Sequence, residues 1–181
     1  LVESGWDLRR VYRRILESRT YQQSPIPRGD TAKCEAMFAC YPVRRLDAEV
    51  LIDALCWIGG TGEGYTSTIP EPYTFIPEDQ RTITLADGSI TSAFLESFGR
   101  PSRDTGLASE RSDQTTDDQR LWLLNSTDVH RRVRNSVRLR AVADATRGDT
   151  DEFVRRTYLT ILSRFPADSE LDTAKAYLLR N

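Results

Sequence analysis

Apolar positions recur with helical spacing along most of the chain, and Pro or Gly residues mark the breaks between these stretches. A first helix is expected over about 6–19. A second is expected over about 46–58 and ends at the Gly59-Gly60 pair, which is a typical helix stop. Later helices are expected near 90–98, over about 115–124 and 128–146, from Asp149 or Thr150 onward, and from about 168 to 179.

The stretch 59–90 lacks this spacing and is expected to be an irregular insertion. Its Gly and Pro residues exclude a long helix, while 73–76 and 82–85 are candidate short strands. Irregular segments of this length in compact domains usually carry function or cover a surface. The insertion is therefore the first candidate for a binding surface.

These patterns predict a mainly α fold: an orthogonal multi-helix domain with one long irregular insertion at about 59–90, which has room for short strands. A chain of 181 residues has the length of one domain. It opens at Leu1 without an initiator Met, in what looks like a helix cap. We therefore interpret residues 1–181 as a single domain from a longer protein.

Composition and charge narrow the classes of function. The chain is 39% hydrophobic and 29% charged, with a net charge of −2, so it has no general attraction to nucleic acid or acidic lipid. No apolar run has the length of a membrane span. All basic residues except Lys33 and Lys175 are Arg, a bias that fits either extensive ion-pair networks or a GC-rich genome.

Residue types that carry catalysis or bind metals are scarce. His130 is the only histidine, which excludes a multi-histidine metal site and makes any catalytic triad depend on that residue. The three cysteines lack CxxC spacing; Cys56 is expected in the core, and a Cys34–Cys40 bridge stays open. No phosphate-binding loop or dinucleotide fingerprint is present. We assign no catalytic residue, no metal ligand and no cofactor to this chain.

Charged residues crowd the start of the helix at 46–58. Arg45, Glu49 and Asp53 follow at intervals of four and share one helix face, with Asp47 beside them. Paired carboxylates next to Arg could perform acid/base chemistry or bind a sugar or cation. The structural alternative, which we favour, is that arginines neutralise these carboxylates.

The helix expected at 128–146 has a basic side and an apolar side. Arg131, Arg134 and Arg138 lie along the first, and Val129, Val133, Val137 and Ala141 along the second. No aromatic residues for base stacking lie nearby, which argues against nucleic-acid binding. The basic side is interpreted as a solvated face or a dock for an acidic partner domain.

Six motifs occur in an order that is characteristic of one family. They are TYQQS at 20–24, RRLDAEVLIDAL at 44–55, FGRPSRDT at 98–105, SER at 109–111, LLNS at 123–126 and LTILSRFPADSEL at 159–171. Together they resemble the planctomycete-type C-terminal domain of unknown function, DUF family 1553. Many relatives place two cysteines where Leu107 and Ser109 stand, so any redox or metal role of those cysteines is absent from this chain.

The resemblance implies a context and no established catalytic residues. Such domains form the C-terminal part of large exported proteins, often behind a cytochrome c-like domain, in bacteria rich in polysaccharide-degrading systems. It therefore implies a periplasmic or cell-surface location, haem only in an upstream domain, and the N-terminal domains of the same polypeptide as partners.

Two hypotheses follow. The first is an interaction or structural module of a larger exported, cytochrome-linked protein, not catalytic as an isolated domain. The second is a carbohydrate-binding or carbohydrate-active domain that uses the 61–77 loop and the nearby charges. Its candidate binding residues, with Trp57 as a further stacking ring, are Tyr65, Tyr73, Phe75, Asp47, Glu49, Asp53, Arg100, Arg103, Glu110 and Arg111.

One observation separates these hypotheses. Carboxylates paired with arginines, together with an open apolar patch near the first helix, favour the module. An open cleft with unpaired carboxylates favours sugar binding.

Overall fold

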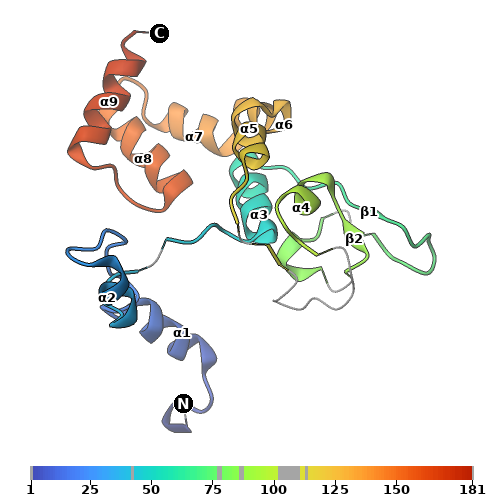
Figure 1. Ribbon diagram of the computed structural model, residues 1–181. Helices are drawn as coiled ribbons and strands as arrows, with labels where there is room; N and C mark the ends of the chain where they lie inside the picture. The colour runs from blue at the N-terminus through green and yellow to red at the C-terminus, as the bar shows by residue number, and fades with distance from the viewer. Residues whose placement is uncertain are drawn as a thin grey trace. The chain divides into compact units, whose positions relative to one another are not determined.

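The computed structural model describes residues 2–41, 43–76, 79–85, 88–101, 111–112 and 114–180. It is mainly α-helical, as predicted, with one small sheet in the described part (Figure 1). The chain divides into two compact units, Leu1–Arg45 and Leu46–Asn181. Its elements are η1 (Val2–Ser4), α1 (Leu8–Leu16), α2 (Thr31–Ala36), α3 (Ala48–Gly59), β1 (Thr66–Ser67), η2 (Thr82–Thr84), β2 (Ile90–Thr91), α4 (Ala93–Ser97), α5 (Asp117–Asn125), α6 (Thr127–Arg134), α7 (Val137–Ala145), α8 (Thr150–Leu162) and α9 (Asp168–Leu178).

The first unit contains α1 and α2, each started by an aspartate cap. The Asp7 carboxylate accepts the backbone N–H of Arg9 at 2.9 Å, and Asp30 caps α2 in the same way. Helix α1 begins later than the predicted residue 6, because the backbone of Trp6 lies in the left-handed region, at φ 66°. It ends at Leu16 rather than near residue 19, and the Ser18 hydroxyl donates to the Ile15 carbonyl there. The short helix α2 was not predicted. All three cysteines of the chain are free.

The core of the second unit forms where α3 meets α4. Its buried residues are Ala48 and Ile52 of α3 together with Phe94, Leu95 and Phe98. The rings of Phe94 and Phe98 stack at 4.2 Å, and the half-buried Trp122 of α5 meets the Phe94 ring edge-on. Figure 1 shows α3 at the centre of this unit with α4 beside it. The helix expected over about 46–58 therefore supplies part of the core.

The insertion between α3 and α4 forms a sheet at positions other than those predicted. Strands β1 and β2 pair antiparallel, with Thr66 opposite Thr91 and Ser67 opposite Ile90. The predicted strand at 82–85 is wrong, because η2 forms there when its amides bind the Asp53 carboxylate. The predicted strand at 73–76 is also wrong, since the Tyr73 N–H closes a turn onto the Pro70 carbonyl.

The predicted helix 128–146 is two helices, α6 and α7. The helix is interrupted at Ser136, because the Ser136 hydroxyl accepts a hydrogen bond from the Leu139 N–H and donates one to the Ile58 carbonyl of α3. Serine side chains often compete with the backbone in this way. The break lets α6 and α7 each pack against α3. The predicted apolar side is largely solvent-exposed, including Val133 and Val137.

The second unit ends in the helices α8 and α9, which pack against each other. Asp149 caps α8, as predicted, and α8 stops at Ser163 in the left-handed conformation. Arg164 then donates two hydrogen bonds to the Glu170 carboxylate, at 2.7 and 2.8 Å, across the turn into α9. Together with the N–H of Ala167, this contact lowers the pKa of Glu170 to about 2. The interhelical turn is therefore held by a charged pair.

Candidate functional site

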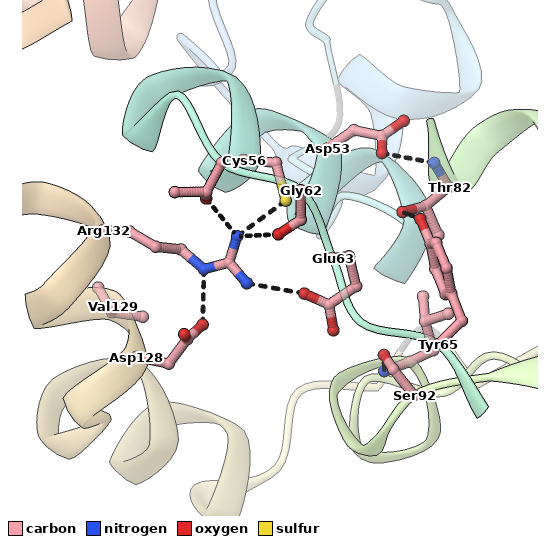
Figure 2. Close-up of polar contacts among 12 residues, drawn as sticks. Asp53, Cys56, Gly62, Glu63, Tyr65, Thr82, Ser92, Asp128, Val129 and Arg132 are labelled. Carbon is pink, nitrogen blue, oxygen red and sulfur yellow. Dashed lines mark hydrogen bonds and ion pairs between the residues drawn. The ribbon is translucent and has the colours of Figure 1, made fainter. Parts of the chain in front are cut away.

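The centre of the candidate site is Arg132, whose guanidinium extends from α6 to the segment that follows α3 (Figure 2). Only 8% of its side chain is exposed. A buried guanidinium is costly unless its N–H groups are paired, so its contacts decide whether it is available to a ligand.

The protein itself satisfies this guanidinium. Its Nε donates to Asp128 at 2.6 Å, and Nη2 donates to Glu63 at 2.8 Å. Nη1 donates to the Thr61 hydroxyl at 2.8 Å, to the Gly62 carbonyl at 3.1 Å and to the Cys56 sulfur at 2.9 Å. We call Arg132 with Asp128, Glu63, Thr61 and Cys56 the Arg132 cluster. It joins α6, α3 and the start of the insertion.

Within the Arg132 cluster, the neighbouring arginines stabilise the charged form of Asp128. Burial alone would raise the pKa of Asp128, but the hydrogen bonds and charges of Arg132 and Arg131 outweigh it and lower the pKa. Burial, only partly offset by Arg132, raises the pKa of Cys56. A thiol with a raised pKa is a poor nucleophile at neutral pH. The cluster is therefore suited to holding segments together rather than to covalent chemistry.

A second set of polar contacts lies around Asp53 of α3. Its carboxylate accepts the backbone N–H of Thr82 at 2.7 Å and of Ile83 at 3.2 Å, and the Arg81 Nε lies 3.4 Å away. The Tyr65 hydroxyl is hydrogen-bonded to the Thr82 hydroxyl at 2.7 Å (Figure 2). Asp53 is thus the anchor of η2, and it fixes the far end of the insertion onto α3.

A third set, the Glu49 cluster, consists of Glu49, Arg100 and Arg111. Arg111 donates two hydrogen bonds to Glu49, at 2.8 and 2.7 Å, in a bidentate pair, and the Arg100 Nε lies 3.3 Å from the same carboxylate. Arg100 also donates to the Ile90 carbonyl of β2 at 2.7 Å. Burial would raise the pKa of Glu49, but the hydrogen bonds and the two guanidinium charges lower it. The cluster ties α3 to both ends of the 100–111 segment.

A model of the family described as protein of unknown function DUF1553 (PSD1) matches residues 1–178. The chain belongs to the DUF1553 family. No match was found among curated proteins or solved structures. The family match confirms the resemblance seen in the motifs.

In this DUF1553 domain, those predicted binding residues that the structure describes do not form one open cleft. Glu49, Arg100 and Arg111 come together in a largely buried ion-pair network, whereas Asp53 and Tyr65 lie at η2. Of the remaining predicted residues, Tyr73 and Phe75 are exposed, Asp47 is the exposed residue before α3 and its charge acts on Arg111, and Arg103 and Glu110 lie outside the described residues. The carboxylates of Glu49 and Asp53 are paired, which is the arrangement expected of the module.

The sequence motifs did not indicate Arg132 as a functional residue. In the sequence it stands beside Arg131 within an Arg-rich helix, and Arg131, whose side chain is 71% exposed, does belong to the solvated basic side. A signal was present in the four-residue spacing from Asp128 to Arg132, which places the two side chains together on a helix. The partners Cys56 and Glu63 lie too far away in sequence to be inferred.

One polar pocket, which we call the Trp57 pocket, lies where α3 ends. It has a volume of about 460 Å³ and is lined by residues of the α3 end, of the 60–65 segment and of 79–81, together with Arg138 of α7. Among the described residues, no group of three or more His, Cys, Asp or Glu side chains is placed to hold a metal ion. The helices of the described part also include none with the length and apolar character of a membrane span.

Proposed function

We propose that this DUF1553 domain is an interaction module that binds another domain of the same polypeptide and is not catalytic on its own. The observation that supports this most is the contrast between its polar and apolar side chains. The buried carboxylates Glu49 and Asp53 and the largely buried Glu63 are all paired inside the domain. Apolar side chains, by contrast, lie open to solvent on both units.

In the first unit, the apolar residues of α1 and of the turn before it are exposed. Trp6, Leu8 and Tyr12 are 67%, 60% and 66% exposed, and Ile15 and Leu16 extend the same set. An amphipathic helix is normally covered on its apolar face. Exposed apolar patches of this kind are typical of surfaces that bind another protein.

In the second unit, an apolar groove lies between α8 and α9, which we call the α8–α9 groove. Its volume is about 590 Å³, and its lining includes Phe153, Val154, Tyr158, Ala174, Tyr177 and Leu178. A groove between two helices with aromatic and aliphatic walls is a common receptor for an amphipathic helix.

Charges next to the α8–α9 groove indicate what kind of helix fits it. The Asp151–Lys175 pair, at 2.6 Å, joins the two helices, and the Arg164–Glu170 pair lies at the turn between them. Because each pair presents both signs of charge, the complementary partner is a helix with an apolar stripe flanked by acidic and basic residues. We propose that an upstream domain of the polypeptide supplies it.

Hydrogen exchange tests this proposal, measured on this chain alone and within the full-length polypeptide. We expect residues 150–178 to exchange more slowly in the full-length protein, since a docked helix suppresses local opening. Tyr177→Glu, which puts a charge into the groove, should remove that protection. Leu179→Glu, at a residue that is 83% exposed and not part of the lining, is the matched control and should keep it. Equal exchange of this segment in the two proteins would contradict the proposal.

The proposal includes the cellular context that the family resemblance implies. The full-length protein would be exported to the periplasm or cell surface, and any haem would be bound by an upstream cytochrome c-like domain. Fractionation of cells that produce the full-length protein, combined with a haem-sensitive absorption spectrum of the purified protein, tests both parts. A cytoplasmic protein without a haem spectrum would contradict this context without affecting the docking proposal.

A further inference from the structure

We propose that the Trp57 pocket binds one ring of a neutral carbohydrate. This site is separate from the α8–α9 groove, and the proposal does not depend on the docking of a partner domain. It rests on the shape of the pocket, on the aromatic side chain at its wall, and on the mixture of hydrogen-bond donors and acceptors that line it.

The pocket has a volume suited to a small ligand. At about 460 Å³ it lies within the range of ordinary ligand sites, which runs from about 300 to 1,000 Å³. Its framework is fixed by contacts described above: the Arg132 cluster holds the 61–63 segment, and Asp53 holds η2. A site whose walls are held in this way loses little conformational freedom when a ligand binds.

An aromatic wall is the first feature that a sugar ring requires. Trp57 lies at the end of α3 and is 50% exposed, and Tyr65 lines the same pocket. The Arg138 guanidinium carbon lies 4.3 Å from the centroid of the Trp57 ring, and its Nε donates to the Trp57 carbonyl at 2.8 Å. Arg138 therefore covers one face of the indole, and a sugar ring would contact the part of Trp57 that stays exposed.

Donors and acceptors for hydroxyl groups are both present. The Arg138 Nε donates to the Trp57 carbonyl, and the Arg81 Nε pairs with the Asp53 carboxylate. The terminal nitrogens of both guanidinium groups can therefore donate to a ligand. Glu63 gives Oε2 to Arg132, which leaves Oε1 as an acceptor. Asp79 adds an exposed carboxylate that has no partner among the described residues.

The charge balance favours a neutral ligand. The lining contains the acids Asp53, Glu63 and Asp79 and the bases Arg81 and Arg138, so it carries three negative and two positive charges. Outside the lining, Arg132 pairs with Glu63 and shares Asp128 with Arg131, so these three residues add one positive charge and bring the local sum to zero. A neutral polyol can use acceptors and donors together, whereas an anion would meet the carboxylates and a cation would meet the guanidinium groups.

Saturation-transfer NMR and calorimetry on the whole chain test the proposal. The probes are the neutral sugars glucose, galactose, mannose and xylose, a neutral oligosaccharide of each, and the charged analogues glucuronic acid and glucosamine. We expect saturable binding of at least one neutral sugar with a Kd on the order of 1 mM. Tighter binding of the oligosaccharide than of its monomer would assign the site to a polysaccharide, and equal binding would assign it to a free sugar. Either result supports the proposal.

Three variants locate the binding. Trp57→Ala should weaken it about tenfold through the lost ring contact. Trp6→Ala makes the same substitution at an exposed tryptophan of the other unit and should leave binding unchanged. If Trp57→Ala fails to fold, Asp79→Trp at the exposed rim still blocks the pocket and should abolish binding.

Three outcomes would overturn the proposal. The first is that no neutral sugar binds saturably. The second is that a charged analogue binds most tightly. The third is that Asp79→Trp binds the sugar as well as the parent chain does. None of these outcomes changes the hydrogen-exchange result expected for the α8–α9 groove.

Discussion

Replacing Arg132 by Ala tests whether the Arg132 cluster holds the second unit together. The substitution removes a guanidinium that is 8% exposed and leaves the Glu63 side chain, 10% exposed, without its cation. Asp128, 28% exposed, loses one of its two arginines. The segment 61–63 also loses its tie to α6, since Thr61 and Gly62 accept from the same guanidinium.

The expected loss is large for a single substitution. Breaking a buried ion pair from one side costs about 3–5 kcal/mol because a buried charge is left unpaired. Asp128 is partly solvated and keeps Arg131, so we place the loss in the free energy of unfolding at the lower end, about 3 kcal/mol. For a chain of this length, that corresponds to a fall in Tm of roughly 6–12 °C. Urea denaturation and calorimetry measure both quantities.

Arg131→Ala is the matched control for this experiment. Arg131 is the adjacent residue, carries the same charge and contacts the same Asp128, but its side chain is 71% exposed. Exposed pairs of this kind contribute below about 1 kcal/mol, so the control should melt within about 4 °C of the parent. Equal destabilisation by the two variants would refute the reasoning, because burial would then make no difference.

A second comparison separates lost attraction from unpaired charge. In the double variant Arg132→Met with Glu63→Gln, the buried carboxylate is removed together with its partner. If the cost of Arg132→Ala comes mainly from the stranded Glu63 charge, the double variant should be more stable than Arg132→Met alone by about 1–2 kcal/mol. A double variant that is no more stable than Arg132→Met would place the cost in lost packing and hydrogen bonds.

Two further predictions concern the segments that α3 organises. The folded-state pKa of Glu49 is lowered, so its stabilising contribution is complete above its unfolded pKa of about 4.3 and is lost as the pH falls through the folded value. The difference in urea midpoint between the parent and Glu49→Gln should therefore be largest near pH 7 and shrink below about pH 4. A difference that stays constant with pH would contradict the ion pair with Arg111. Gly99 has φ +84°, and a Cβ there would overlap the Ser112 carbonyl, so Gly99→Ala should lower the free energy of unfolding, measured with urea, by about 2 kcal/mol or more. Gly148 has a similar φ of +86° but no atom within 4 Å of a built Cβ, so Gly148→Ala should lower it by only about 1 kcal/mol. Similar losses in the two variants would contradict the close contact at Gly99.

Helix ends were predictable because they depend on residues close together in sequence. Thr116 caps α5 and forms a reciprocal capping box with Gln119, Ser126 caps α6, and Gly60 ends α3 in the left-handed conformation. Each of these contacts spans about four residues, so a local pattern contains all of it. The predicted strand positions were wrong for the opposite reason. Their pairing joins residues more than twenty positions apart, and the Asp53 carboxylate competes for the amides of η2.

The amino-acid sequence by itself determined the mainly α class, the family, most helix ends, and the presence of carboxylates near arginines, because periodicity, caps and motif order are local or composition-level properties. Only the tertiary structure decided which charges are buried. Arg131 and Arg132 are alike in sequence, yet one is solvated and the other binds residues 69 to 76 positions away. Likewise, Glu49 meets Arg111 across 62 residues. Burial and pairing depend on how distant segments pack, and that packing determines which charged groups are neutralised and which apolar surfaces stay exposed.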